Sequence, residues 1–161
     1  MLAHFLHWLE STAPAIAISE SSWLFPGIES IHVIAITLVV GSITMVDLRL
    51  LGLNLNEHSA GDVIAEILPW TWISFAVAAC TGALMFSSNA THYWGTVPFR
   101  AKMLVLTLAG LNMLLFHATI FRSIDVWGRR IQTPPAAKAS GAISLGLWIG
   151  VVTLGRWIGF V

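Results

Sequence analysis

The sequence predicts an all-α integral membrane protein, a four-helix bundle with a short N-terminal interfacial helix. Two observations carry this prediction. First, 57% of the 161 residues are hydrophobic and only 10% are charged, whereas a typical soluble domain is roughly 25% charged. Second, the chain contains four apolar stretches, each close to the roughly 20 residues that an α-helix needs to cross a bilayer. We therefore expect a single membrane domain over residues 1–161.

The charge balance limits the partners. Eight Lys and Arg residues oppose eight Asp and Glu residues, so the formal net charge is zero. Surfaces that bind nucleic acid carry a basic excess, so we expect no nucleic-acid partner and a lipid bilayer as the main surroundings. The single cysteine, Cys80, excludes an internal disulfide.

The N-terminal segment MLAHFLHWLE predicts the interfacial helix, over about residues 2–10. Its apolar residues fall on one helical stripe, which is too short to span and suits a position in the plane of the membrane surface. His4 and His7 are three residues apart and therefore share a helix face. Residues 11–22 are small and polar and are predicted to form a connector.

The four spans are predicted from apolar runs and from prolines at their starts. Pro26, Pro69 and Pro98 each suit the first turn of a helix. Residues 54–66 are predicted to form a loop or a short surface helix, and residues 87–97 a loop that holds His92. The spans are expected over about residues 26–46, 69–86, 98–121 and 141–160.

The basic residues predict the orientation in the membrane. An even number of spans places both termini on one side, and loops rich in Lys and Arg face the cytoplasm. The bias predicts a bacterial inner-membrane protein with both termini in the periplasm. Five basic residues fall on the predicted cytoplasmic side and three on the other, namely Arg49, Arg122, Arg129, Arg130 and Lys138 against Arg100, Lys102 and Arg156.

Helix rise separates the membrane histidines by depth. His32 follows Pro26 by six residues, and His117 follows Pro98 by nineteen, on spans that run in the same direction. At about 1.5 Å per residue the two differ in depth by roughly 20 Å, so we expect that they cannot share one haem or one metal ion. The ionisable groups then form an outer layer with Glu29, His32, His92, Arg156 and possible additions from His4 and His7, and an inner layer with Asp47, Arg49, His58, His117, Arg122 and Asp125.

Haem b is one cofactor that these layers suggest, because neutral imidazoles inside a bundle can bind haem iron. His32 with His92, and His117 with His58, could each hold one haem, although His92 and His58 lie in predicted loops. Met85 and Met45 are alternative axial ligands. Arg156 and Lys102 could lie near haem propionates or a quinone.

Metal binding is a second possibility. Glu29 and His32 have the Glu-x-x-His spacing of di-iron bundles, and His4 and His7 could add ligands for copper or zinc. The single Glu-x-x-His copy is a weak signal, since such bundles need two. For His32 and His117, a purely structural role is favoured over ligation of haem or metal, and a quinone or proton-relay role is a further option. For His4, His7 and His58, plain surface exposure is favoured.

Polar residues on different spans that lie at similar membrane depth are expected to contact each other. Glu29 is predicted to pair with Arg156 and Asp47 with Arg122, because a lone charge at membrane depth costs several kcal/mol. Asn112, in the middle of the third span, is predicted to form hydrogen bonds between helices. Gly146 and Gly150 form a GxxxG pair, for which packing within the bundle is favoured over a subunit interface.

Four segments of the chain resemble a bacterial family of small, uncharacterised, four-helix membrane proteins. They are LFPGIESIHVIAITLVVGSITMVDLRLLGL, TGALMF, VPFRAKMLVLTLAGLNMLLFH and SLGLWIGVVTLGRWI. The resemblance covers most of the chain and implies four spans. A looser similarity to copper-resistance membrane proteins and small di-haem cytochromes b is one of fold, which does not establish function. The motif positions that the family resemblance marks are Glu29, His32, Asp47, Arg49, Lys102, Asn112, His117 and Arg156.

Three functions are compatible with these features. The first is a membrane anchor and electron-transfer subunit that carries haem b, with His32 and His117 as ligands, and links a periplasmic dehydrogenase or cytochrome c to the quinone pool. The second is a non-redox structural or assembly subunit, in a complex or a homo-oligomer. The third is a protein that handles copper or another metal. Because so little of the chain lies outside the membrane, we expect a subunit rather than a complete enzyme.

Overall fold

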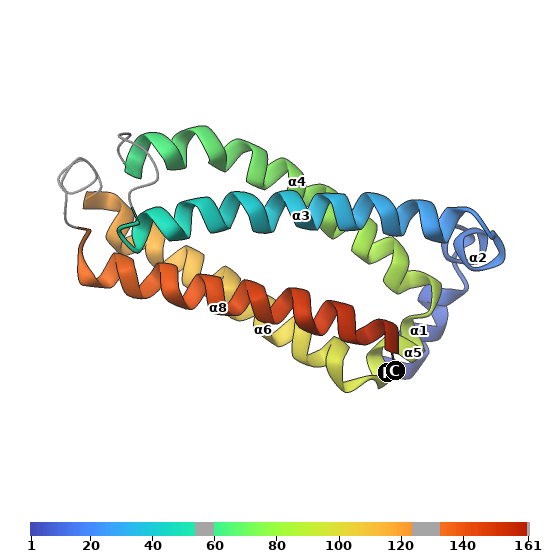
Figure 1. Cartoon of the computed structure of the whole chain (residues 1–161). Coiled ribbons are helices and arrows are strands. Elements are labelled where there is room, and N and C mark those ends of the chain that lie inside the picture. Colours follow the sequence, from blue (N-terminus) through green and yellow to red (C-terminus); the bar gives the residue numbers. More distant parts are fainter. Residues whose placement is uncertain (54–59, 124–132, 161) are drawn as a thin grey trace.

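The computed structural model describes residues 1–53, 60–123 and 133–160, and within these ranges the chain is helical with short connections (Figure 1). The helix α6 continues as a π-helix, Phe116–Ile120, and a 3-10 turn, Phe121–Ser123, and α8 ends in the 3-10 turn Ile158–Phe160. The α-helices are α1 (Leu2–Glu10), α2 (Ala13–Glu20), α3 (Leu24–Leu50), α4 (Ala60–Ser88), α5 (Ala90–Gly95), α6 (Val97–Leu115) and α8 (Pro135–Trp157).

Four of these helices are long and apolar enough to cross a membrane, which confirms the predicted all-α, multi-pass architecture. Large hydrophobic side chains cover their outer faces; Ile34, Leu104 and Ile149 are each more than 60% exposed. Such a surface is unfavourable in water and suits contact with lipid chains. The spanning segments are Leu24–Leu50, Ile64–Ser88, Val97–Ile120 and Pro135–Phe160.

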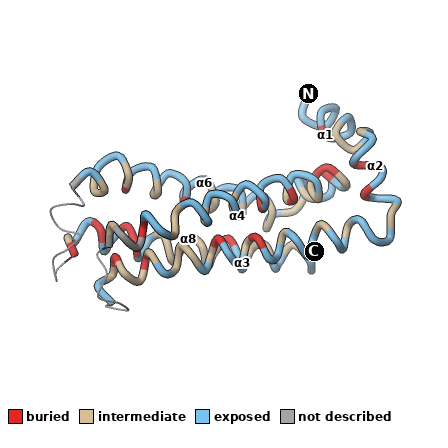
Figure 2. Tube along the Cα trace, turned by 90° about the horizontal axis from the view of Figure 1, so that it is seen from above, coloured by how far each residue is buried: buried red, intermediate tan, exposed pale blue. Residues whose placement is uncertain are grey.

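The bundle consists of two helix pairs. α3 packs along α4, and α6 packs along α8, while contact between the pairs runs mainly through α3 and α8. α4 and α6 barely touch each other. In Figure 2 the pairs run lengthwise together, with α3 and α8 on one side of the molecule and α4 and α6 on the other. One long seam of the bundle is therefore closed and the opposite seam is loose.

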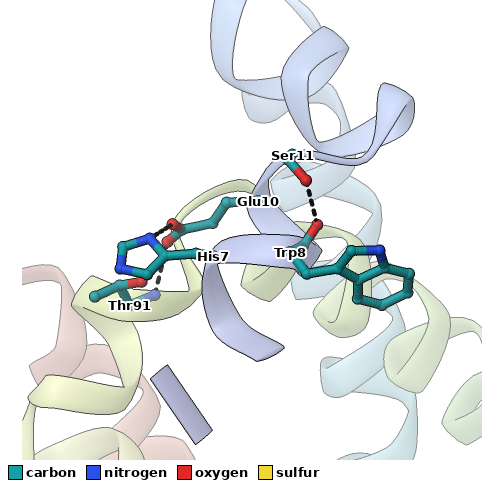
Figure 3. Close-up of polar contacts among 5 residues, drawn as sticks. All are labelled: His7, Trp8, Glu10, Ser11 and Thr91. Carbon is teal, nitrogen blue, oxygen red and sulfur yellow. Dashed lines mark hydrogen bonds and ion pairs between the residues drawn. The ribbon is translucent and has the colours of Figure 1, made fainter. Parts of the chain in front are cut away.

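Both termini lie at the same end of the bundle, together with α1, α2 and α5 (Figures 1 and 2). There, α1 docks on α5 through Glu10: its Oε1 accepts a hydrogen bond of 2.7 Å from the backbone N–H of Thr91, and its Oε2 lies 3.5 Å from Nδ1 of His7 (Figure 3). Ser11 closes the helix end by donating to the Trp8 carbonyl. The hydrogen bond from Thr91 holds the pKa of Glu10 below its ordinary value.

Three predicted boundaries differ from the structure. The second spanning helix starts at Ala60, so that Pro69 lies inside it rather than in its first turn. Proline is tolerated there because neighbouring helices and side chains can satisfy the freed backbone groups of a membrane helix. The predicted connector over residues 11–22 contains α2, with Pro14 near its start, and the predicted loop over residues 87–97 contains α5.

α3 and α8 approach each other closely at Gly141. A Cβ atom at this position would lie 3.1 Å from the carbonyl oxygen of Asp47 and 3.2 Å from Cβ of Leu50. Gly150 of the predicted GxxxG pair packs against Val105 of α6, whereas Gly146 has no neighbour within 4 Å. The glycine that permits the tight crossing is therefore Gly141, which lies more than one helical turn before the predicted pair, Gly146 and Gly150. Next to it, Leu50, Ile64, Phe116 and Ala137 form a buried cluster.

Candidate functional site

All four spanning helices contribute to a cavity of about 310 Å³ in the half of the bundle away from the termini. Its walls are mostly apolar, from Val39 and Ile43 of α3 to Leu106 of α6. A volume of this size falls at the lower end of the roughly 300–1,000 Å³ that small-molecule pockets occupy. The polar side chains in its lining are Asp47, Thr71, Asn112, His117, Ser140 and Ser144.

Asp47 is the acidic residue in the cavity lining. It extends from the last turn of α3, is only 4% exposed, and has a side-chain interaction with Ser144 of α8. Its second carboxyl oxygen, Oδ2, is buried and has no hydrogen-bond partner among the described residues. Buried polar atoms are nearly always partnered, and one that is not calls for an explanation. A ligand in the cavity would supply the missing partner.

His117 lies in the π-helix that continues α6. Its Nδ1 is 2.9 Å from the carbonyl oxygen of Met113, which can only accept, so Nδ1 carries the hydrogen. In the neutral ring the other nitrogen, Nε2, is then an acceptor with a free lone pair. Short π-helices inside membrane or soluble helices occur frequently at functional sites. This one displaces the regular backbone pattern where the histidine meets the cavity.

Asn112 connects α6 to α8, as predicted. Its amide nitrogen donates to the Ser140 carbonyl at 3.1 Å, and the Ser140 hydroxyl donates back to the amide oxygen at 3.2 Å. This reciprocal pair fixes the wall of the cavity opposite α3 and α4. Asn112 is therefore partnered within the protein, unlike Oδ2 of Asp47.

The cavity reaches the lipid-facing surface at the loose seam between α4 and α6. Trp72 of α4 and Leu114 of α6 both line it, and they are 49% and 61% exposed. Away from the stacked rings of Phe86 and Phe99 at the end that carries the termini, α4 and α6 have few contacts, so this side of the cavity is loosely packed. A hydrophobic molecule could therefore enter from the bilayer without passing through water.

His32 belongs to a different site, towards the end that carries the termini. Its Nδ1 lies 2.8 Å from Oγ1 of Thr81, on α4. The Thr81 hydroxyl donates its hydrogen to backbone carbonyls of its own helix, chiefly that of Val77 at 2.7 Å. Its oxygen therefore accepts a hydrogen bond from His32. The imidazole rests on Gly82, where a Cβ would lie 3.0 Å from Cε1. His32 does not line the cavity that contains His117.

Lys102 lies near His32 on the opposite helix pair. Its half-buried side chain runs over Gly155 of α8, where a Cβ would lie 3.2 Å from Nζ. His32 interacts electrostatically with both Lys102 and Glu29. No carboxylate of the described residues is within ion-pair distance of Lys102. The side chains of His32 and Lys102 thus each occupy space that a glycine of a neighbouring helix leaves open.

An aromatic cluster holds α5 beside this site. The ring of Tyr93 packs beside both Phe86 of α4 and Phe99 of α6, with centroid distances of 6.4 and 6.0 Å. Phe86 and Phe99 stack on each other at 5.0 Å. Burial, and to a lesser degree the carboxylate of Glu29, raises the pKa of Tyr93. His92 is on α5 but exposed, and it does not approach His32 as a hydrogen-bond partner.

The predicted ion pair between Glu29 and Arg156 is wrong. Both side chains are exposed, and in the described part of the chain the one ion pair joins His7 to Glu10. The guanidinium of Arg156 instead lies 5.0 Å from the centre of the Phe160 ring. Near a membrane boundary a long basic side chain can reach water, so that it needs no carboxylate partner.

The predicted pair of Asp47 with Arg122 is also wrong. Asp47 faces the cavity, whereas Arg122 is exposed on the 3-10 turn after the π-helix. Depth alone placed them together, but the helical turn on which each side chain lies points them apart. His58 and Asp125, the other predicted members of the inner layer, lie outside the described residues.

The candidate metal ligands are not brought together. In residues 1–53, 60–123 and 133–160, no three His, Cys, Asp or Glu side chains are close enough to hold a metal ion. His4 and His7 are exposed on α1, and Glu29 is exposed on α3. His117, also named as a possible metal ligand, lines the cavity together with one acidic residue, Asp47.

Sequence reasoning missed the cavity and two of its serines. Ser140 and Ser144 are four residues apart and therefore share one face of α8, a spacing visible in the sequence. Thr81, the partner of His32, was likewise not identified. A polar residue on one span at the depth of a histidine on the next is the signal that would have indicated it.

The comparisons with known proteins supply a family and no activity. No curated protein and no solved structure matches the chain. The model of a family of unknown function, DUF6644, matches residues 20–161, which include all four spans. The chain therefore belongs to this family of unknown function, DUF6644.

Proposed function

We propose that this protein is the membrane subunit of an electron-transfer system and that its cavity binds a quinone of the bilayer. One observation carries the proposal: an apolar cavity inside the bundle contains a buried carboxyl group, Asp47, with one unpartnered oxygen. Binding sites combine apolar walls with a few polar groups that fix the orientation of the ligand.

A quinone matches this cavity in shape and polarity. It has one small ring with oxygen atoms at two ends, and it is soluble in lipid. Trp72 and Phe75 offer aromatic surface for the ring, and Asp47 and His117 offer polar contacts. The loose seam between α4 and α6 provides entry from the membrane.

Quinone binding can be measured through tryptophan fluorescence, because quinones quench it and both Trp72 and Trp148 line the cavity. We expect saturable quenching when a short-chain ubiquinone is added to the purified protein in nanodiscs. Asp47→Leu removes the polar group and leaves an apolar side chain of similar size, and should weaken binding about tenfold or more, which corresponds to roughly 1.4 kcal/mol. Glu20→Gln, on the exposed surface of α2, is the matched control and should bind like the wild type.

Two results would contradict the quinone site. One is quenching that rises linearly with quinone and never saturates, as for a molecule that merely dissolves in the lipid. The other is an unchanged affinity in Asp47→Leu together with an unchanged quenching amplitude in Trp148→Phe. Trp148→Phe removes one of the two tryptophans that line the cavity, and it should reduce the quenching amplitude if the quinone lies there.

Haem b is the second candidate ligand, favoured by the arrangement of His32 and His117. In each ring Nδ1 is held by a neighbour, Thr81 or Met113, which leaves Nε2 available to bind iron. Metal-binding histidines usually donate the other ring N–H to a neighbouring acceptor in this way. Each histidine could hold haem iron from one side, and the described residues bring no second histidine to either. Haem would supply a one-electron carrier, and Lys102 could neutralise a propionate beside His32.

The haem proposal has a direct spectroscopic test. Protein made with ample haem and reduced with dithionite should show a b-type α band, and His32→Ala and His117→Ala should each remove the part of it that comes from the haem at that histidine. His4→Ala is the control, since that side chain is exposed on α1. A reduced spectrum without the band would exclude haem while leaving quinone binding open to the fluorescence experiment.

The proposal includes a location and a type of partner. The excess of basic residues favours a bacterial inner membrane with both termini in the periplasm. The end formed by α1, α2 and α5 would then face a periplasmic dehydrogenase or cytochrome c. An alkaline phosphatase fused to the C-terminus should be active in that orientation. An inactive phosphatase, together with a fluorescent C-terminal green fluorescent protein fusion, would reverse the assignment.

A further inference from the structure

We infer that the cavity prefers the reduced, dihydroxy form of its ligand, the quinol, over the oxidised quinone. This inference rests on the proposed quinone site and specifies which redox form the site recognises. It follows from the hydrogen-bonding capacity that the protein itself leaves unused in the cavity.

His117 provides the first unused group. Met113 occupies the hydrogen on Nδ1, at 2.9 Å, so the neutral ring can offer only the lone pair of Nε2 to a ligand. No hydrogen bond to Nε2 is formed by any described residue. The preferred neighbour of this nitrogen is therefore a hydroxyl hydrogen.

Asp47 provides the second unused group, from a different helix. Its Oδ2 is buried in the same cavity and has no partner among the described residues. When the carboxyl group is ionised, or carries its proton on the other oxygen, Oδ2 accepts from a hydroxyl group; when Oδ2 itself carries the proton, it can donate to the ligand's oxygen instead. Asn112 does not compete for the ligand through its oxygen, since that atom already accepts from Ser140.

A quinol satisfies both groups, whereas a quinone leaves Nε2 of His117 without a donor. The quinol has two hydroxyl groups at opposite ends of its ring, so that it can donate one hydrogen to His117 and one to Asp47. The quinone has two carbonyl groups and no hydrogen to donate, which leaves Nε2 of His117 facing another lone pair. An unpartnered buried acceptor weakens binding substantially. We expect the quinol to bind about tenfold or more tightly than the quinone.

The preference can be measured as a potential. A site that binds the reduced form more tightly raises the midpoint potential of the bound couple, by about 30 mV for each factor of ten in a two-electron reaction. We expect a positive shift of about 30 mV or more for a short-chain ubiquinone titrated in nanodiscs with the full-length protein, relative to empty nanodiscs. His117→Phe keeps an aromatic ring but removes the acceptor, and should bring the shift close to zero.

A second measurement does not depend on redox chemistry or on a single variant. The di-O-methyl ether of the same quinol has its ring and tail but no hydroxyl hydrogen, and it should compete for the cavity about tenfold or more weakly than the quinol. His117→Gln, whose amide oxygen is again an acceptor, should retain part of the preference if His117→Phe fails to fold.

The outcomes separate this inference from the proposed function. If neither redox form binds saturably, the quinone site itself is wrong. If both forms bind with equal affinity, or the quinone binds more tightly, the quinone site stands and the preference is overturned. Equal competition by the quinol and its dimethyl ether would overturn it as well.

Discussion

The imidazole of His32 lies so close to Gly82 that a Cβ atom there would be 3.0 Å from Cε1. Such a contact would be tighter than nine in ten real Cβ contacts. Gly82 of α4 therefore makes room for a histidine of α3, and the adjacent Thr81 accepts a hydrogen bond from the same ring. Two neighbouring residues on one helix thus fix both the position and the tautomer of a side chain on the other.

Gly82→Ala should destabilise the protein because the His32 ring must shift and lose its 2.8 Å contact with Thr81. We expect a cost of about 1–3 kcal/mol, as for other insertions into packed contacts. The measurement is the free energy of unfolding in mixed micelles with a denaturing detergent. Gly41→Ala, on the same helix pair but with nothing within 4 Å of the new Cβ, should change stability by less than about 0.5 kcal/mol.

Gly141→Ala should be more damaging than Gly82→Ala, because the new methyl group would meet the backbone of α3. The carbonyl oxygen of Asp47 at 3.1 Å cannot rotate away as a side chain can. α3 and α8 must separate, so we expect a loss at the upper end of about 1–3 kcal/mol and an altered cavity. Gly146→Ala on the same helix is the control, since its Cβ meets nothing within 4 Å. Equal stability of the two variants would contradict this crossing.

The hydrogen bonds between Asn112 and Ser140 should appear as an energetic coupling. In a double-mutant cycle with Asn112→Leu and Ser140→Ala, we expect a coupling energy of about 0.6 kcal/mol, the average found for such pairs in a membrane protein. The backbone acceptor of Ser140 remains in Ser140→Ala, so this variant isolates the hydroxyl. Additive effects of the two substitutions would show that the hydroxyl contributes nothing.

The docking of α1 on α5 should weaken in acid. The Thr91 hydrogen bond lowers the pKa of Glu10 in the folded protein below its ordinary value of about 4.5. A group with a lowered pKa stabilises the folded state above the unfolded-state value, and this contribution disappears as the pH falls through the folded-state pKa. Amide hydrogen exchange at Thr91, corrected for its intrinsic pH dependence, should therefore lose protection below about pH 4.5.

Glu10→Gln is the control for this transition. Its side-chain oxygen can still accept from the Thr91 amide but does not titrate in this range. Exchange in this variant should show no corresponding step. A step that persists in Glu10→Gln would assign the transition to another group.

The sequence was sufficient for the spans because burial in lipid requires long apolar helices whatever their packing. Their boundaries were harder to predict. Pro69 lacks a backbone N–H and therefore suits the first turn of a helix, but in the structure it lies inside α4. The rule that proline opens a helix is weaker where neighbouring helices can satisfy the freed backbone groups.

The sequence predicts which residues belong to the candidate site. It does not predict which of them contact each other. His32, Asp47, Asn112, Lys102 and His117 were all identified from polarity at membrane depth. Depth fixes only one coordinate, however, and the azimuth of each side chain depends on how helices rotate and cross. For this reason Asp47 was assigned to Arg122, although it faces a cavity and interacts with Ser144.

The loose seam between α4 and α6 determines which concentration matters for the ligand. A molecule that enters through Trp72 and Leu114 equilibrates with the bilayer, where a lipophilic compound is far more concentrated than in the surrounding water. Occupancy then follows its mole fraction among the lipids. Diluting the sample with buffer should leave the cavity filled, whereas adding empty lipid or detergent should empty it.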